Sequence, residues 1–565
     1  MSATAKAANT DEELAPMRGA DMVVRALEAQ GATTIFGYPG GAIMPVYDAL
    51  AGSNLKHILC RHEQGAAFAA AGWSRMRGKA GVCLATSGPG ATNLVTGIAD
   101  AFMDSVPLVA VTGQVSQAVM GTDAFQEIDT FGITMPVVKH SYIVRRTEDI
   151  PSVIAEAFRI AEEGRPGPVL VDIPKDVQIA EAYSAIDAPQ PRERAAMDDK
   201  AVDAARVAMA TAKKPLFYLG GGVVRGGATE AVRALIERSG IPAVATLQAQ
   251  GVLPTDHPQF LGMLGMHGCR GANLAVQDTD LLIVMGARFD DRATGKLDGF
   301  APNARVIHFD RDISEIGKLR EAQIAVGGEL ADCANALGDV RPEIGDWFVT
   351  CTANKAEFAP QYDAPGEGVY APGFLKMLSE KAGDAFVGVA DVGQHQMWIA
   401  QHCRFSRPQA HLTSGGLGSM GFSLPTGIGA QLAEPDATVV SISGDGGFMM
   451  NIQELATINR YNVPLKVVVV DNARLGMVRQ WQELFFDENY SEVDLSDNPD
   501  FAEVARAFRI PAFTLKSAAD MESAIDRFLK AEGPMLLHVI IDPSENVWPL
   551  VPPGATNSQM MDADE

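Results

Sequence analysis

Hydrophobic and polar positions divide the chain into two kinds of segment. Short apolar runs rich in Val and Ile predict buried strands, and the stretches between them carry apolar residues at helical spacing. In the first third of the chain the strand-like runs cover residues 33–36, 56–60, 80–85, 107–112 and 168–173. Strands that alternate with helices in this way are typical of a parallel sheet covered by helices.

The same alternation recurs twice further along the chain. The later strand-like runs cover residues 215–219, 281–285, 304–309, 437–443 and 465–470. Two polar stretches that contain proline, residues 187–199 and 352–368, separate the three groups of strands and are predicted linkers.

We therefore predict an α/β fold with three consecutive parallel-sheet domains. Their predicted bounds are residues 17–186, 199–345 and 369–545, followed by a tail over residues 546–565. The length of 565 residues agrees with this division, because globular domains average about 150–200 residues.

Composition narrows the choice of function. The formal net charge of −24 offers no basic surface for nucleic acid or for an anionic membrane. No apolar run approaches the ~18 residues that a membrane-spanning helix needs. The six cysteines lie far apart without a CxxC pair, so neither a zinc site nor a disulfide framework is expected, and a cytoplasmic location is predicted.

The third unit contains a candidate metal and phosphate site. The strand over 437–443 ends at the sequence Gly-Asp-Gly-Gly, which includes Asp445, and the next strand ends just before Asn472. Because the carboxyl ends of parallel strands meet at one edge of a sheet, we expect Asp445 and Asn472 to lie close together and to share Mg²⁺. The neighbouring glycines would let backbone N–H groups approach a diphosphate. Taken alone, Gly-Asp-Gly is more often only a tight turn.

Several longer segments resemble the catalytic subunits of the acetohydroxyacid (acetolactate) synthase family of thiamine diphosphate (ThDP) enzymes. The resemblance covers about residues 18–557 and rests on YPGGAI (38–43), RHEQGA (61–66), TSGPGATN (86–93), GTDAFQE (121–127), MLGMHG (263–268), GARFDDR (286–292), VGQHQMW (392–398), SGGLGSMG (414–421) and GMVRQWQ (476–482). It implies a pyrimidine-binding domain, a central FAD-binding domain and a diphosphate-binding domain, in that order.

The resemblance assigns the ThDP site. It implies that Glu63 activates the cofactor by a charge-assisted hydrogen bond to the pyrimidine ring. A Glu in the first turn of a helix more often only interacts favourably with the helix dipole. Asp445, Asn472 and the backbone carbonyl of Arg474 would hold Mg²⁺, and Met420 would bend the cofactor, although Met420 also suits core packing. The other implied ThDP contacts are Gly40, Gly41, Gln394, His395, Gly418, Gly444, Gly446, Gly476 and Met477.

The central domain is expected to bind FAD. Gly220 to Gly222 form only an imperfect dinucleotide fingerprint without a clear ribose-binding acid, so a nicotinamide cofactor is disfavoured. The resemblance implies FAD contacts at Arg165, Thr246, Leu247, His267, Gly286, Arg288, Asp290, Asp310 and Glu329. The family more often has Asp at position 329.

The implied reaction decarboxylates pyruvate and joins the remaining two-carbon unit to a second 2-ketoacid. Pyruvate would give 2-acetolactate and 2-ketobutyrate would give 2-aceto-2-hydroxybutyrate, on the route to valine, leucine and isoleucine. Arg292 would bind the second ketoacid's carboxylate with its planar guanidinium. The resemblance places the other substrate contacts at Phe125, Gln126, Lys139, Met477 and Trp481, with Glu63, Gln126, Arg292 and Trp481 as the catalytic set.

The resemblance also implies a homodimer or tetramer with ThDP at the subunit interface, and it allows for a regulatory small subunit. The alternative is an FAD- and ThDP-dependent pyruvate oxidase or decarboxylase. The segments GARFDDR and GMVRQWQ favour carboligation over this alternative. A glyoxylate carboligase lacks the carboxylate at position 63, and a non-catalytic relative would be expected to lose Glu63, Asp445 or Asn472.

Overall fold

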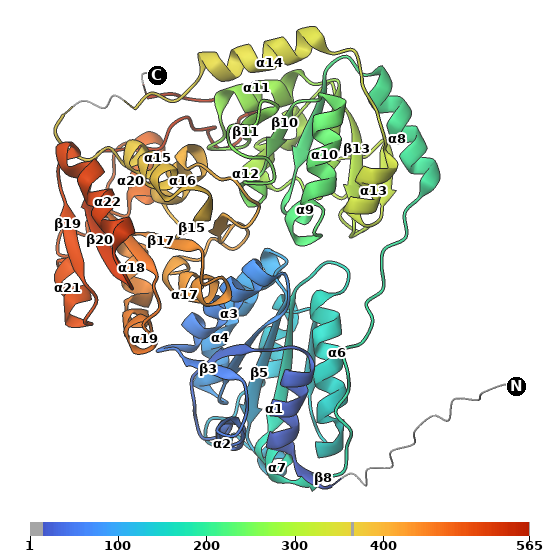
Figure 1. The fold of residues 1–565 in the computed structure, drawn as a ribbon, viewed down its shortest axis with the longest axis vertical. Helices are drawn as coiled ribbons and strands as arrows, with labels where there is room; N and C mark the ends of the chain where they lie inside the picture. The colour runs from blue at the N-terminus through green and yellow to red at the C-terminus, as the bar shows by residue number, and fades with distance from the viewer. Residues whose placement is uncertain (1–14, 363–365, 564–565) are drawn as a thin grey trace, which may run out of the picture.

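The computed structural model describes residues 15–362 and 366–563 and contains three six-stranded parallel sheets with helices on their faces (Figure 1). In Figure 1 the N-terminal sheet lies at the bottom, the central one at upper right and the C-terminal one at left. The predicted fold class is confirmed. No helix within the described ranges is long and apolar enough to cross a membrane.

The N-terminal sheet has the strand order β3-β2-β4-β5-β7-β6. Its strands are β2 (Thr34–Gly37), β3 (Lys56–Leu59), β4 (Gly81–Ala85), β5 (Leu108–Gln114), β6 (His140–Ile143) and β7 (Pro168–Pro174). Its helices are α1 (Gly19–Ala29), α2 (Met44–Leu50), α3 (Glu63–Arg77), α4 (Pro89–Met103), α5 (Thr130–Thr134), α6 (Ile150–Glu162) and α7 (Lys175–Ile179). The short strands β1 (Met17–Arg18) and β8 (Glu181–Ala182) pair with each other beside it.

The central sheet has the order β11-β10-β9-β12-β13-β14, which is the arrangement of many dinucleotide-binding folds. Its strands are β9 (Pro215–Leu219), β10 (Ala243–Ala245), β11 (Phe260–Met263), β12 (Leu281–Met285), β13 (Arg305–Asp310) and β14 (Ile324–Gly327). Its helices are α8 (Asp199–Thr211), α9 (Gly221–Arg225), α10 (Thr229–Ser239), α11 (Arg270–Asp278), α12 (Asp291–Thr294), α13 (Leu330–Ala336) and α14 (Gly345–Glu357).

The C-terminal sheet has the order β16-β15-β17-β18-β20-β19. Its strands are β15 (Phe386–Ala390), β16 (His411–Thr413), β17 (Thr438–Gly444), β18 (Lys466–Asp471), β19 (Ala512–Leu515) and β20 (Met535–Ile540). Its helices are α15 (Ala371–Ala382), α16 (Gln394–His402), α17 (Ser423–Ala433), α18 (Asp445–Asn451), α19 (Leu455–Tyr461), α20 (Gly476–Phe485), α21 (Phe501–Ala507) and α22 (Met521–Lys530).

The apolar runs of the sequence are continuous because the strands are covered on both faces. Every residue of β4, β9, β12 and β15 is buried. The two terminal domains meet where α3 packs against α17, side by side in Figure 1. Gly72 and Gly429 lie in this contact, where a Cβ on either glycine would collide with the partner helix's backbone. The small residues of α3 therefore bring the two domains into close contact.

The chain between the domains differs in detail from the predicted linkers. Residues 183–198 form neither helix nor strand, but α14 occupies part of the predicted linker 352–368, of which residues 363–365 lie outside the described residues. Trp347 and Cys351 of α14 belong to the central core. The C-terminal tail also packs on the central domain, where the buried Asn557 donates a hydrogen bond to the Ala293 carbonyl (3.0 Å).

Candidate active site

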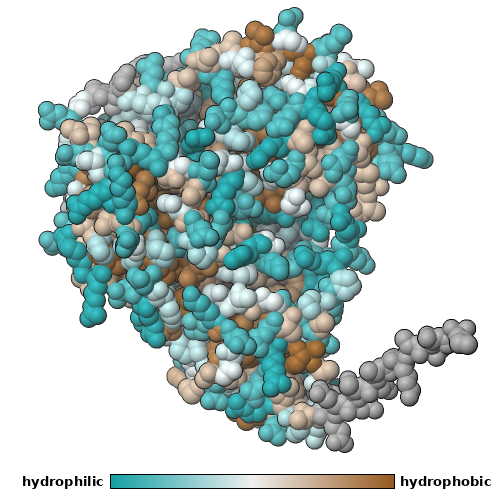
Figure 2. All heavy atoms as spheres, viewed as in Figure 1, coloured by the Kyte–Doolittle hydropathy of each residue, from teal (hydrophilic) through white to brown (hydrophobic). Residues whose placement is uncertain are grey.

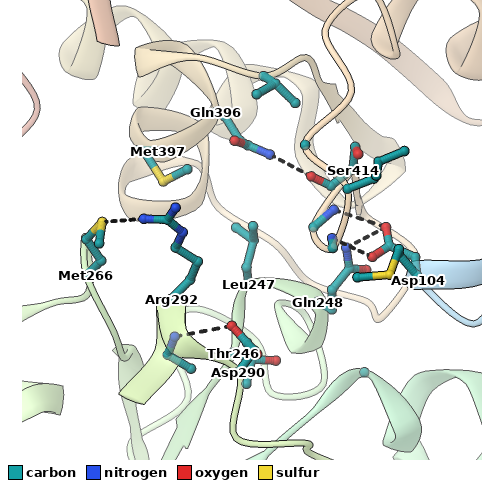
Figure 3. Close-up of a pocket in the computed structure, with 18 of the residues that line it drawn as sticks. Asp104, Thr246, Leu247, Gln248, Met266, Asp290, Arg292, Gln396, Met397 and Ser414 are labelled. Carbon is teal, nitrogen blue, oxygen red and sulfur yellow. Dashed lines mark hydrogen bonds between the residues drawn. The ribbon is translucent and has the colours of Figure 1, made fainter. Parts of the chain in front are cut away.

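A cavity of about 850 Å³ runs between the central and C-terminal domains. It lies beyond the carboxyl ends of β9, β12, β17 and β18, where ligands bind in open parallel sheets. Residues 103–105 and 164–166 of the N-terminal domain line its far end. Figure 3 shows part of the lining, with side chains from all three domains.

Asp445 and Asn472 lie at one edge of the C-terminal sheet, as the sequence predicts. Asp445 begins α18 directly after β17, and Asn472 follows the neighbouring parallel strand β18. The Asp445 carboxylate, which is 2% exposed, accepts a hydrogen bond from Asn498 Nδ2 (3.2 Å). Asn472 Nδ2 donates to Gln394 Oε1 (3.1 Å), which holds the amide in place. Both side chains line the cavity.

The charge around Asp445 suits a small dication. Burial, together with the neighbouring charge of Asp471, raises the pKa of Asp445 to about 7. Asp471 is paired with His538 (2.8 Å) and places a second carboxyl group beside Asp445. Across residues 15–362 and 366–563 there is no cluster of three or more His, Cys, Asp and Glu side chains placed to hold a metal. One carboxylate and one amide agree with Mg²⁺, which fills the rest of its shell with phosphate oxygens and water.

The backbone around these two residues is open toward the cavity. Gly444, Gly446 and Gly476 all line it, and a Cβ on Gly476 would collide with Gln394. Burial lowers the pKa of His395 to about 3, so its ring is neutral, and Nε2 accepts a hydrogen bond from the Gly444 N–H (3.1 Å). The glycines thus leave room for a phosphate group beside the start of α18.

The residues assigned to FAD lie together in the other part of the same cavity. All nine line it: Arg165, Thr246, Leu247, His267, Gly286, Arg288, Asp290, Asp310 and Glu329. Gly222 donates its N–H to the Gly286 carbonyl (3.0 Å), so the ends of β9 and β12 approach closely, where a Cβ on Gly222 would meet the Gly286 backbone. Glu329 accepts a hydrogen bond from the Ala195 N–H (3.2 Å).

Arg292 is available to bind an anion. Its side chain is 63% exposed. Nε lies 3.8 Å from Asp291 Oδ2, and Nη1 contacts the sulfur of Met266 at 3.4 Å. Figure 3 shows the guanidinium between Met266 and Met397. Trp481 and Met477 line the same cavity from α20, and the Trp481 ring packs edge-on against Phe485. The guanidinium of Arg292 and the apolar side chains of Met477 and Trp481 therefore face the same cavity.

Glu63 belongs to a second group of residues in the N-terminal domain. It is 9% exposed, and its Oε2 accepts a hydrogen bond from Asn93 Nδ2 (3.0 Å). A Cβ on Gly40 would collide with Thr86, and one on Gly90 would touch both Thr86 and Glu63. None of these five residues is among the described residues that line the cavity.

The remaining predicted residues of this domain also lie away from the cavity. Gln126 contacts Gly88, Phe125 is 88% exposed, and Gly41 is exposed. Lys139 donates hydrogen bonds to the Ile160 and Glu163 carbonyls at the end of α6, a site that accounts for its ammonium group without a substrate. The substrate role of Lys139 stays a prediction.

Two buried acids that the sequence did not single out support the cavity wall. Asp100 and Asp104 of α4 and its C-cap pair with Arg75. Asp104 accepts hydrogen bonds from the Gly415 N–H (3.0 Å), the Gly416 N–H (2.8 Å) and Gln248 Nε2 (3.1 Å), so one carboxylate joins the three domains (Figure 3). The only sequence signal was two acids four positions apart at the end of a helix with no other charged residue.

Comparisons with known proteins agree with this arrangement. Residues 17–133, 202–337 and 391–539 match the families described as thiamine pyrophosphate enzyme, N-terminal TPP binding domain, central domain, and C-terminal TPP binding domain. Fold and site together define a thiamine pyrophosphate (ThDP) enzyme.

Relatives narrow the class further. The chain is 54% identical to the acetolactate synthase isozyme 2 large subunit of Escherichia coli, over 97% of this chain and 100% of the relative. It is 45% identical to the isozyme 1 large subunit of the same organism, over 96% and 97%. It is 47% identical to the acetolactate synthase large subunit of Parasynechococcus marenigrum, over 96% and 90%. The chain belongs to the acetolactate synthase large-subunit family, which confirms the resemblance found in the sequence.

Proposed function

We propose that two copies of this chain form each active site and that the site joins pyruvate to a second 2-ketoacid, either pyruvate or 2-ketobutyrate. The observation that supports it most strongly is the separation of the two halves. Asp445 and Asn472 line the cavity, whereas Glu63 lies with Gly40 and Gly90 in a second group outside the cavity. From this separation we infer that a cofactor that meets both halves takes the N-terminal half from another copy.

The surfaces beside both halves are suited to a contact between copies. Leu417 and Val478 at the rim of the cavity are 43% and 48% exposed, and Met450 of α18 is 53% exposed. Phe125, beside the Glu63 group, is almost fully exposed. The face shown in Figure 2 is mostly polar with scattered apolar side chains. Exposed apolar side chains beside a site are typical of a surface that a partner covers.

We assign the cofactor contacts as the sequence does. Asp445, Asn472 and the Arg474 carbonyl would hold Mg²⁺, and the glycines beside them would admit the diphosphate. The residues assigned to FAD would bind that cofactor in the part of the cavity that the central domain lines. The strand order of the central sheet suits a dinucleotide. Bound ThDP supplies a nucleophilic carbon and the electron sink for decarboxylation.

The chain's own groups then orient the reactants. Glu63 would hold a proton at the pyrimidine ring, and its burial strengthens that hydrogen bond. Arg292 would bind the carboxylate of the second ketoacid through two N–H groups, while Trp481 and Met477 contact its alkyl group. Burial of the reaction between two subunits would limit the entry of water, which favours carbon–carbon bond formation over protonation.

The test uses the purified protein with pyruvate, ThDP, Mg²⁺ and FAD. We expect acetolactate to form, and added 2-ketobutyrate to yield the mixed product. Oxygen uptake or acetaldehyde release without acetolactate would instead indicate an oxidase or a decarboxylase. An Arg292→Lys variant should raise KM for the second ketoacid, because lysine cannot form the bidentate contact.

The relatives are named large subunits, and on that basis we also propose a small-subunit partner for this chain. Co-purification with the small subunit of a close relative, together with a change in specific activity, would support it. Activity and elution volume that do not respond to the small subunit would contradict it.

A further inference from the structure

Glu454 is a buried acid for which the proposed function has no role. It ends a short 3-10 turn, Ile452–Glu454, that interrupts the helix following Asp445, and its side chain is fully buried. Its Oε1 accepts hydrogen bonds from the backbone N–H groups of Arg61 (2.9 Å) and His62 (3.1 Å). These are the two residues directly before Glu63, the first residue of α3.

The neighbouring contacts make this junction specific. Thr457 donates a hydrogen bond to Glu454 Oε2 (2.6 Å) and fixes the second carboxylate oxygen. Tyr461 accepts a hydrogen bond from the Leu59 N–H (2.8 Å) on the strand that leads to Glu63. A Cβ on Gly65 would lie 2.5 Å from Glu454 Oε1, so only glycine at position 65 admits the carboxylate.

We propose that Glu454 is a positioning residue that sets the direction of the Glu63 side chain, by holding the two backbone N–H groups at the start of α3. The proposal rests on the proposed role of Glu63 in activating ThDP. The direction of a side chain at the first position of a helix depends on the backbone conformation of the residues before it. A carboxylate that accepts two N–H groups in a buried site holds that backbone firmly.

The position of Glu454 in the chain gives this contact a further consequence. The segment from Asp445 to Tyr461 begins at the proposed metal site and ends against the strand and helix that carry Glu63 of the same chain. If each active site combines two copies, these two groups serve different active sites. Glu454 therefore connects the cofactor clamp of one site to the activating acid of the other.

The first experiment replaces Glu454 by Met, which keeps the length but removes both acceptors, and by Gln, which keeps one. We expect kcat of Glu454→Met to fall about 10- to 100-fold, because a shift of about 1 Å in a catalytic group costs that order. The affinity for ThDP should stay within a few-fold of the parent, and Glu454→Gln should recover most of kcat. The exposed Glu532→Gln serves as the control and should match the parent.

A double variant distinguishes positioning from general stability. If Glu454 acts through Glu63, then Glu454→Met should cost almost nothing further in a Glu63→Gln background, because the two losses are not additive. The exchange of the thiazolium C2 proton of bound ThDP for deuterium should slow in Glu454→Met by the same factor as kcat. A weakened affinity for ThDP with kcat unchanged, or losses that multiply in the double variant, would overturn the proposal.

Amide hydrogen exchange in the apoprotein tests the contact without cofactor or turnover. The Arg61 and His62 amides should exchange faster in Glu454→Met than in the parent. In Thr457→Val, which keeps the carboxylate, the increase should be smaller. This second variant replaces the first if Glu454→Met does not fold. Unchanged exchange at residues 56–66 in these variants would contradict the proposal. A parent protein that makes no acetolactate would instead count against the proposed function, since the exchange result stands independently of it.

Discussion

The two terminal domains share one frame but carry different chemistry. Numbered within each domain, both sheets have the strand order 2-1-3-4-6-5, whereas the central sheet has 3-2-1-4-5-6. In the N-terminal domain the proposed activating acid is Glu63, just after the second strand. In the C-terminal domain the proposed metal ligands are Asp445 and Asn472, after the third and fourth strands. The shared fold places the ends of the strands along one edge of each sheet. A few residues at that edge then give each domain its own chemistry.

The two domains also treat their acids differently. Asp445 faces a cavity and has Asp471 as a neighbouring acid, so a bound cation would stabilise its charge, whereas Glu63 is held by Asn93 and lies near Thr86 and Gly90. We therefore expect changes in the first to affect cofactor binding and changes in the second to affect turnover. Four predictions test this contrast and the contacts that support each domain.

The largest effect is expected at Glu63. Glu63→Gln should lower kcat by about 10³- to 10⁴-fold, the upper part of the range for acid–base groups, while the affinity for ThDP changes little. Steady-state kinetics and equilibrium titration with ThDP separate the two quantities, with Glu532→Gln as the control. A kcat equal to that of the parent would remove the distinction between the domains.

Asp445→Asn should give the next largest effect and the opposite pattern. Loss of the carboxylate should lower activity about 10²- to 10³-fold at ordinary Mg²⁺ concentrations, since the cation and the diphosphate bind weakly, and excess Mg²⁺ should restore part of it. Calorimetric titration of Mg²⁺ and ThDP measures the change. The exposed Asp346→Asn is the control. Cofactor affinity equal to the parent's would show that Asp445 is not a ligand.

Asp104→Asn should have a smaller effect, on the joint between the domains. It leaves part of the network around Gly415, Gly416 and Gln248 unsatisfied, which should lower the free energy of unfolding by about 1–3 kcal/mol and weaken cofactor binding. Urea unfolding checks the first effect, and the exposed Asp203→Asn is the control. Unchanged stability would mean that the loop is held by other contacts.

The smallest effect concerns Asp172 in the core of the N-terminal domain. Burial raises its pKa to about 7, although Thr112 and Gln114 donate hydrogen bonds to it. A carboxyl with a raised pKa holds its proton longer in the folded state, so its contribution to stability is lost as the pH rises from about 4 to 7. Asp172→Asn should flatten this dependence by about 1–3 kcal/mol. Parallel unfolding curves for parent and variant across that window would refute the assignment.

Most of the frame was predictable from the sequence, because buried parallel strands leave continuous apolar runs. Asp445 and Asn472 followed from the same argument, since strand ends meet at one edge. The segment after Asp445 is divided by a short 3-10 turn that ends at Glu454, whose partners Arg61 and His62 are almost 400 positions away along the chain. Periodicity reports only local burial, so neither this contact nor the network at Asp104 was visible in the sequence.

In the proposed dimer, one active site takes Glu63 from one copy and Asp445 from another. Mixing inactive Glu63→Gln and Asp445→Asn chains after dissociation tests it most directly, because a mixed dimer then contains one site with both halves intact. We predict that activity returns to about a quarter of the parent's, since about half the dimers are mixed and each has one working site. If tagged chains show that mixed dimers form and no activity returns, each active site lies within one chain, which would contradict the proposed arrangement.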